Sequence, residues 1–251
     1  MDELKGRIAL ITGAGSGIGA STARLFAEES VAGVTLTDIQ QQPMQSLAEE
    51  LEQRFGTPVL VSRTDVSDPS QVEEMVRKTV RKYDRLDILV NSAGICPMVP
   101  WDETNLENWN RILSINLTGA YLCCKAVLPH MRRQQFGRLV HISSVGGFVG
   151  SITGHVAYGA SKAAVIALSK YLAKQFASEG ILSNVVAPGT IDTPLTDSFG
   201  AENKHRFIEA SLLKRQGSPR ELAEAVLFLS SSRSSYVTGS TMHVNGGSLL
   251  I

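Results

Sequence analysis

The sequence predicts an α/β fold, a single domain built on a doubly wound parallel sheet with helices on both faces. Short apolar runs alternate with helical patterns along the whole chain, and this alternation is typical of parallel strands joined by covering helices. The chain has 251 residues, 43% of them hydrophobic, which is enough to bury the core of one such domain. No repeat, low-complexity tract or linker divides it, so we expect residues 1–251 to form one unit.

The expected strands are the apolar runs at 8–12, 34–37, 59–61, 88–91, 139–143, 182–187 and 241–244. The expected helices lie between them, at 20–29, 43–55, 69–82, 109–131, 158–178 and 220–229. The segment 189–216 has no clear periodicity. Because it follows a strand at the edge where such sheets bind ligands, we expect it to act as a substrate lid.

The first expected strand runs into a glycine-rich loop, Gly13-Ala14-Gly15-Ser16-Gly17-Ile18-Gly19. Glycine permits a tight turn and lets the backbone approach a ligand. The helix that follows offers unpaired amides and the positive end of its dipole to a pyrophosphate. The spacing differs from the common Gly-x-Gly-x-x-Gly, so the loop alone is weak evidence. With the strand before it, the loop predicts a dinucleotide site of the Rossmann type.

Tyr158 and Lys162 stand about one helical turn apart, so their side chains project from the same face. An unperturbed phenol has a pKa of about 10, and a nearby cation favours the phenolate. Tyr158 is therefore a candidate general acid/base. Ser143 and Ser144 follow an apolar run upstream, where a hydroxyl is able to hold a carbonyl or alcohol oxygen. Taken alone, Tyr-x-x-x-Lys is more often structural, with the tyrosine at a core helix and the lysine in solvent.

Over almost its whole length the sequence resembles the short-chain dehydrogenase/reductase family. The motifs that carry the resemblance, in the family's order, are Thr12 to Gly19, Asn91-Ser92-Ala93-Gly94, Asn116, Ser144, Tyr158 with Lys162, Pro188-Gly189, Thr238-Gly239 and Asn245-Gly246-Gly247. Ser92 stands where the family more often has a second asparagine. Ser144 precedes Tyr158 by fourteen residues, one more than is usual there. The resemblance implies an oxidoreductase that interconverts a secondary alcohol and its ketone by hydride transfer.

The resemblance also implies roles for the catalytic residues. Tyr158 exchanges the proton, and Lys162 contacts the nicotinamide ribose and lowers the pKa of the phenol. Ser144 matches the family's serine better than Ser143 does, and it positions the reacting oxygen. The backbone at Asn116 holds a water that relays protons from Lys162. An alternative interpretation of Asn116 is a buried polar residue that satisfies its neighbours.

Cofactor choice depends on Asp38, which ends the second strand nineteen residues after Gly19. At that distance the dinucleotide fold places an acid on the adenosine ribose. A carboxylate there accepts hydrogen bonds from the ribose hydroxyls and repels a 2′-phosphate, and Ser16 supplies no cation, so NAD is favoured over NADP. A turn-forming Asp is the alternative.

The resemblance implies a larger set of cofactor-binding residues. They are Gly13, Ser16, Gly17, Ile18, Gly19, Asp38, Asp65, Val66, Asn91, Ala93, Gly94, Tyr158, Lys162, Pro188, Gly189, Ile191 and Thr193. Asp65 is expected to meet the adenine amino group, although it is nearly as well explained as the cap of the helix that begins at Pro69. Ile191 and Thr193 are expected to hold the nicotinamide amide.

Composition limits the binding partners and the cellular compartment that we expect for this protein. The net charge is zero and no basic stripe is present, so nucleic acid is not expected as a partner. No apolar run reaches the roughly 18 residues of a membrane span, and the charged first residues lack the core of a signal peptide. Three cysteines, Cys96, Cys123 and Cys124, without metal-ligand spacing suit reduced thiols. We therefore expect a soluble cytoplasmic protein without a metal site.

Three other functions stay open. A catalytically silent NAD-binding regulator usually loses part of the Ser/Tyr/Lys set, and a nucleotide-sugar epimerase usually has a longer chain. The main alternative is a 3-oxoacyl carrier-protein reductase of fatty acid synthesis. Such reductases typically use NADP, and Asp38 argues against that. The side chains expected around a small-molecule alcohol or ketone are mostly apolar, namely Pro97, Met98, Val99, Trp101, Phe148, Ile152, Leu195 and Phe199.

The helices expected at 109–131 and 158–178 carry more small and apolar residues than one sheet face needs. In the family the matching helices pack across a two-fold axis. We therefore expect a homodimer or, preferably, a homotetramer, with the apolar end Ser248-Leu249-Leu250-Ile251 buried at a second interface.

Overall fold

The computed structural model describes residues 3–150 and 154–251 and contains a seven-stranded parallel sheet. The strands are β1 (Ile8–Thr12), β2 (Gly33–Asp38), β3 (Val59–Arg63), β4 (Ile88–Asn91), β5 (Gly137–Ile142), β6 (Ile181–Pro188) and β7 (Thr241–Val244). Their order is β3-β2-β1-β4-β5-β6-β7, so the winding reverses between β1 and β4. In such sheets a ligand binds beyond the carboxyl ends of the strands at this reversal. The predicted doubly wound parallel sheet is confirmed.

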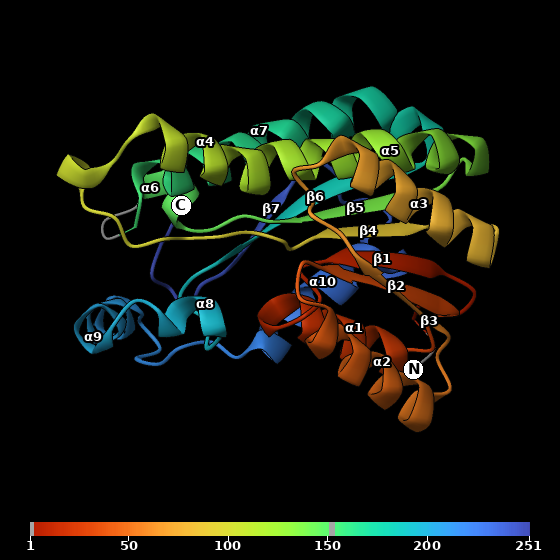
Figure 1. Cartoon of the computed structure of the whole chain (residues 1–251), viewed down its shortest axis with the longest axis horizontal. Coiled ribbons are helices and arrows are strands. Elements are labelled where there is room, and N and C mark those ends of the chain that lie inside the picture. Colours follow the sequence, from red (N-terminus) through yellow and green to blue (C-terminus); the bar gives the residue numbers. More distant parts are fainter. Residues whose placement is uncertain (1–2, 151–153) are drawn as a thin grey trace.

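Helices cover both faces of the sheet (Figure 1). One layer contains α1 (Gly17–Glu28), α2 (Gln41–Phe55) and α10 (Pro219–Ser230), and the other contains α3 (Pro69–Tyr83), α5 (Gly119–Gln134) and α7 (Val156–Phe176). Along β1, Ala9 and Ile11 pack into the first core, whereas Ile8 and Leu10 pack into the second. This alternation follows from the two-residue period of a strand. Because both faces are buried, the first four residues of the strand are all apolar.

The long helix expected at 109–131 is divided into three parts. It consists of α4 (Leu106–Leu113), the π-helical segment η2 (Ser114–Thr118) and α5. The π-helical turn contains Asn116, whose buried side chain bonds to the loop after β4. Single π turns inside helices often occur at functional sites.

The composite run Leu106–Gln134 is long and apolar enough to cross a membrane by length and composition, contrary to our expectation that no such run exists. Within the protein 39% of its apolar window is buried, and α5 packs Cys123, Val127 and Met131 into the core. One such helix is weak evidence for a membrane span, because core helices of globular proteins pass the same test.

The segment 189–216 contains the short helix α8 (Pro194–Asp197) and the helix α9 (Ala201–Ala210). Its base is closed by a parallel bridge between Ile191 and Gly217. Near its other end the Ser211 hydroxyl donates to the Gly246 carbonyl at 3.0 Å, and the Leu213 amide donates to the same oxygen at 3.2 Å. The segment that carries the two helices is therefore held to the rest of the protein by these contacts. Figure 1 shows α8 and α9 outside the two helical layers.

Four short helical turns complete the description. They are η1 (Trp101–Glu103), α6 (Gly146–Val149), η3 (Ala177–Glu179) and η4 (Ser232–Ser234). Asp68 directly precedes helix α3, and its carboxylate accepts hydrogen bonds from the Ser70 and Gln71 amides. Asp68, and not Asp65, is therefore the cap of this helix, which removes the capping alternative for Asp65.

Candidate active site

A cleft of about 700 Å³ opens at the carboxyl ends of the strands, where the winding reverses. Its walls come from the glycine loop before α1, the end of β2, the loop after β4, the region between β5 and α7, and the segment that carries α8 and α9. These segments lie far apart in the sequence, and the parallel sheet brings their ends to one edge.

Ser144, Tyr158 and Lys162 come together on one wall of this cleft. Ser144 follows β5, and Tyr158 and Lys162 lie on the first turns of α7. The Ser144 hydroxyl is hydrogen-bonded to Tyr158 and also accepts from the Gly146 amide at 3.0 Å. The Lys162 Nζ lies 5.7 Å from the centre of the Tyr158 ring and donates to the Ile142 carbonyl at 2.9 Å.

The two neighbouring serines have different surroundings. Ser143 is buried, and its hydroxyl donates to the main-chain carbonyl of Lys162 at 2.8 Å. That bond fixes α7 to the end of β5. The Ser144 hydroxyl is the one bonded to Tyr158. The geometry therefore gives Ser143 a structural contact and places Ser144 beside the tyrosine.

Burial controls the ionisation of this group. It raises the pKa of Tyr158 above the usual phenol range, and the Cys96 thiol adds to the rise, while the hydrogen bond with Ser144 lowers the pKa. The predicted phenolate is therefore not the stable form of Tyr158 in the chain alone. Burial also lowers the pKa of Lys162 to about 8 and raises that of Cys96 to about 11. The resting group contains a neutral phenol and a neutral thiol.

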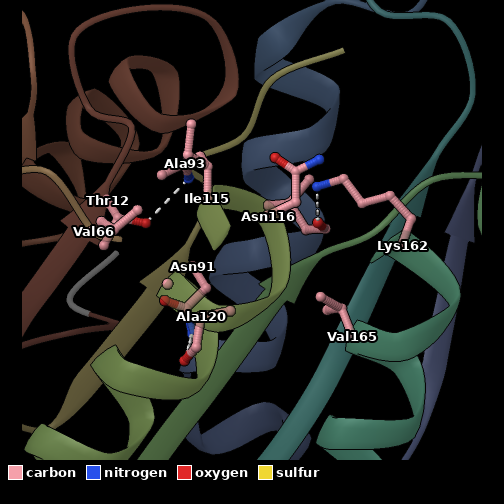
Figure 2. Close-up of a pocket in the computed structure, with 11 residues that line it drawn as sticks. Thr12, Val66, Asn91, Ala93, Ile115, Asn116, Ala120, Lys162 and Val165 are labelled. Atoms are coloured by element: carbon pink, nitrogen blue, oxygen red, sulfur yellow. Dashed lines mark hydrogen bonds between the residues drawn. The ribbon is translucent and has the colours of Figure 1, made fainter. Parts of the chain in front are cut away.

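Behind Lys162 lies a small cavity of about 10 Å³, shown in Figure 2. Lys162 and Asn116 both line it, and in the figure the lysine nitrogen points toward the asparagine. A cavity needs roughly 10–15 Å³ by this measure to hold one water, so it is of the right order for a single molecule. The side chain of Asn116 accepts from the Ile95 amide at 2.8 Å and donates to the Ile95 carbonyl at 2.9 Å and to the Ser161 hydroxyl at 3.2 Å.

The glycine loop is shaped by close contacts. Gly13 has a φ of +66°, and an added Cβ would lie 2.8 Å from the Ala93 amide nitrogen. A Cβ on Gly19 would lie 2.2 Å from the Gly13 carbonyl oxygen. Neither position accepts a larger residue without a backbone shift. Of the two, Gly13 lines the cleft, whereas Gly19 supports the loop from behind.

Asp38 lies at the cleft wall where β2 ends. One carboxylate oxygen accepts from the Gly15 amide at 3.1 Å, and the other accepts from the Gln40 amide at 3.0 Å. On the neighbouring strand the exposed Arg63 is in register with Asp38, and its Nε donates to the Ile39 carbonyl at 3.1 Å. Arg63 is a cation near this wall that the sequence alone did not reveal.

The structure places most of the predicted cofactor residues on the cleft. Those that line it are Gly13, Ser16, Gly17, Ile18, Asp38, Asp65, Val66, Ala93, Gly94, Tyr158, Lys162, Pro188, Gly189, Ile191 and Thr193. Asn91 lies deeper, where it lines the small cavity and its amide contacts the Ala120 carbonyl and His141. One oxygen of Asp65 is occupied by the amide and hydroxyl of Ser67.

Other parts of the site were not predicted. The Thr12 hydroxyl accepts from the amides of Ser92 and Ala93, at 3.1 Å each, and so fixes the loop after β4. Arg111 and Ile115 of the α4 region face the cleft together with Cys96. Arg111 and Ile115 are one helical turn apart in the sequence, and this spacing could have indicated that they share one face of the helix.

The expected substrate wall is only partly correct. Leu195 and Phe199 line the cleft, and Phe207 and Val149 join them. Trp101 and Phe148 are exposed and are not among the lining residues that the structure describes. The loop residues Pro97, Met98 and Val99 are partly exposed and are not among the described lining residues either, and Ile152 lies outside the described residues.

These residues fit a dinucleotide. The twelve-residue helix α1 begins at the cleft, and its first amides have no side-chain cap, which is the arrangement that binds a pyrophosphate. The carboxylate of Asp38 lies at the end of the second strand, and the Ser144, Tyr158 and Lys162 group lies across the same cleft.

Comparison with known proteins agrees with this geometry. A family model described as Enoyl-(Acyl carrier protein) reductase matches residues 13–248. The 3-oxoacyl-(acyl-carrier-protein) reductase of Thermotoga maritima is 40% identical over 98% of both chains, and that of Aquifex aeolicus is 37% identical over 98% of both chains. The crystal structure of gox2181 superposes with a TM-score of 0.93 at 33% identity, covering 98% of this chain and 96% of that one.

Proposed function

Because the chain belongs to the short-chain dehydrogenase/reductase family, we propose that it is a nicotinamide-dependent reductase of 3-oxoacyl thioesters, with Tyr158 as the proton donor. One observation carries the chemistry: Ser144, Tyr158 and Lys162 meet in one cleft with a dinucleotide wall opposite them. The product is the 3-hydroxyacyl thioester, in which the former carbonyl carbon holds the added hydride and the oxygen holds the added proton.

The bound nicotinamide dinucleotide supplies the hydride. Ser144 donates a hydrogen bond to the substrate carbonyl oxygen and stabilises its developing negative charge, an interaction worth roughly 3 kcal/mol for one well-placed donor. Tyr158 then gives its proton to that oxygen. The raised pKa of Tyr158 suits this direction, because the phenol is neutral and ready to donate.

Lys162 and Asn116 take part in returning a proton to Tyr158 after the reaction. As the phenol loses its proton, the ammonium of Lys162, 5.7 Å from the ring centre, stabilises the phenolate. The cavity shared by Lys162 and Asn116 is of the right order for one water. Such a water relays the replacement proton between solvent and Lys162.

The substrate class rests on the relatives and on the lid. The relatives at 40% and 37% identity are named for reduction of a 3-oxoacyl group on acyl carrier protein. The inner side of the lid carries Leu195, Phe199 and Phe207, and the two phenylalanine rings meet edge to face at 5.8 Å. An apolar wall of this kind suits an acyl chain. This substrate fits better than the simple alcohol that the sequence first suggested.

We assign NAD(H) to this reaction rather than NADP(H). Asp38 lines the cleft, and each of its carboxylate oxygens accepts one main-chain hydrogen bond, which leaves a second lone pair on each oxygen for the ribose. Two ribose hydroxyls complete that set, whereas a 2′-phosphate meets a like charge. Arg63 opposes this effect from the neighbouring strand, but it is exposed and is held by the Ile39 carbonyl.

The test is a substrate panel with both cofactors. The purified chain is supplied with acetoacetyl-coenzyme A, an acetoacetyl group on acyl carrier protein, and simple aliphatic and cyclic ketones, and cofactor oxidation is followed by absorbance. The proposal predicts the highest kcat/KM for the thioesters. A higher kcat/KM for the simple ketones would replace the substrate class by that of an alcohol dehydrogenase, and no turnover with any of them would refute the activity.

A further inference from the structure

His155 connects three parts of the active-site wall, although the mechanism above does not use it. It lies at the start of α7, three residues before Tyr158, and is fully buried. Its ring Nε2 lies 2.6 Å from the Asn108 Oδ1 on α4, and its Nδ1 lies 3.0 Å from the Ala157 amide nitrogen. Its own amide donates to the Pro97 carbonyl at 3.0 Å.

The partners fix the state of the ring. Because the Ala157 amide is a donor, Nδ1 must accept and so carries no proton. The Asn108 Oδ1 accepts from the Asn105 amide as well, at 3.0 Å, which identifies it as the oxygen. Nε2 therefore carries the proton and donates it. The ring is neutral, and burial lowers the pKa of His155 in the direction that keeps it so.

The loop after β4 is fastened to the catalytic region at two points. The side chain of Asn116 bonds to both main-chain groups of Ile95, and the main-chain amide of His155 donates to the carbonyl of Pro97. Between these points Cys96 lines the cleft, and its thiol acts on the pKa of Tyr158. The position of this wall relative to the tyrosine therefore depends on both contacts.

His155 also fixes the turn that carries the tyrosine. The Tyr158 amide donates to the His155 carbonyl at 2.9 Å, so the two residues share the first turn of α7. The ring bond to Asn108 ties that turn to α4, a helix 47 residues earlier in the chain. We propose that His155 is a positioning residue, whose ring holds Tyr158 in register with Ser144 by joining the start of α7 to α4.

This inference rests on the role that the proposed function gives to Tyr158. Three variants separate the contacts of the ring. His155→Ala removes both ring bonds. His155→Asn keeps an acceptor for the start of the helix, because asparagine is a favoured N-cap, but is too short to reach α4. Asn108→Ala removes the partner on α4 and leaves the histidine in place.

Two further variants serve as references. Asn105→Ala is the matched control for Asn108→Ala, because it disturbs the same helix cap without removing the bond to His155. Tyr158→Phe shows the rate without the proton donor. Each variant is assayed for kcat and KM with NADH and acetoacetyl-coenzyme A, or with whichever ketone the parent protein reduces, and for Tm.

We expect His155→Ala to lower kcat by roughly tenfold to a hundredfold, since a misplacement of about 1 Å at a reacting group costs about that much. The KM for NADH should not change. Asn108→Ala and His155→Asn should each lower kcat less than His155→Ala. The double variant His155→Ala with Asn108→Ala should lose no more kcat than His155→Ala alone, because both changes remove the same bond. Asn105→Ala should keep the kcat of the parent.

Two results would overturn the inference. One is a His155→Ala protein that keeps the parent kcat while its Tm falls, which would leave the histidine only a structural role. The other is a change in the KM for NADH with kcat unchanged. If His155→Ala does not fold, an unchanged kcat in both His155→Asn and Asn108→Ala overturns it instead. An active Tyr158→Phe would refute the proposed function itself, which is a separate outcome.

Discussion

Replacing Asp38 by asparagine tests the cofactor assignment with the smallest change of shape. Asp38→Asn keeps one carbonyl oxygen for the main-chain amides of Gly15 or Gln40, which the carboxylate now accepts at 3.1 and 3.0 Å. It removes the negative charge and exchanges the second oxygen for a donor. The variant therefore loses one hydrogen bond to the adenosine ribose, and the bond that remains is no longer charge-assisted.

The size of the effect follows from that bond. A hydrogen bond to a charged group contributes about 1.5–3 kcal/mol, and every 1.4 kcal/mol is about tenfold in affinity. We expect the Kd for NADH to rise by roughly 10- to 100-fold on this scale. The Kd for NADPH should fall, because its 2′-phosphate no longer meets a carboxylate and Arg63 lies on the next strand.

The assay is a fluorescence titration of both reduced cofactors against the parent, Asp38→Asn and Asp65→Asn. Asp65 lines the same cleft, but we expect it to contact the adenine, which the two cofactors share. Asp65→Asn should therefore weaken NADH and NADPH equally. The reasoning would be refuted by a parent protein that binds NADPH as tightly as NADH, or by an Asp38→Asn variant with an unchanged ratio of the two Kd values.

Three further predictions follow from the site. Ser144→Ala should lower kcat far more than Ser143→Ala, because only Ser144 is bonded to Tyr158, and the reverse order in steady-state assays would exchange their roles. The lid at 189–216 should gain protection from hydrogen exchange when NADH and a substrate analogue bind, and equal protection with and without them would argue against a lid. The chain should form a homotetramer or at least a dimer, since Leu250 and Ile251 are 76% and 78% exposed in the isolated chain. Light scattering that returns a monomer would contradict this assembly.

Much of the fold could be predicted because its strands are buried on both faces. Runs such as Ile8–Thr12 and Ile88–Asn91 are apolar up to their last residue, and their bounds match the structure. Parts without an apolar pattern were missed. Helix α9 (Ala201–Ala210) has no fully buried residue, and its only large apolar residues are the adjacent Phe207 and Ile208, which do not form a repeat.

The π-helical turn at Ser114–Thr118 was missed for a different reason. Helical periodicity continues through Leu106–Gln134, and nothing local marks a change of hydrogen bonding. The turn is understood only from a distant contact, the pair of bonds between Asn116 and Ile95. Tertiary bonds of this kind leave no periodic signal in a single sequence.

The sequence predicted which residues lie in the candidate site, but it did not predict their pKa values. The motif spacing identified Tyr158, Lys162 and the glycine loop, and the structure brings them to one cleft. The pKa of Tyr158 was expected to fall because of Lys162, whereas burial raises it. The burial of Tyr158 depends on how the whole chain folds, so the motif spacing does not reveal it. The bond between Asn108 and His155 is equally invisible, because the two residues are 47 positions apart.

The most direct test of the central claim compares the parent protein with Tyr158→Phe, which removes only the phenolic hydroxyl. NADH binding is measured by fluorescence, and reduction of acetoacetyl-coenzyme A is followed in a single turnover. The account predicts that Tyr158→Phe binds NADH as the parent does and forms no 3-hydroxyacyl product. Product formation at the parent's rate would contradict the account, because the proton would then come from another group.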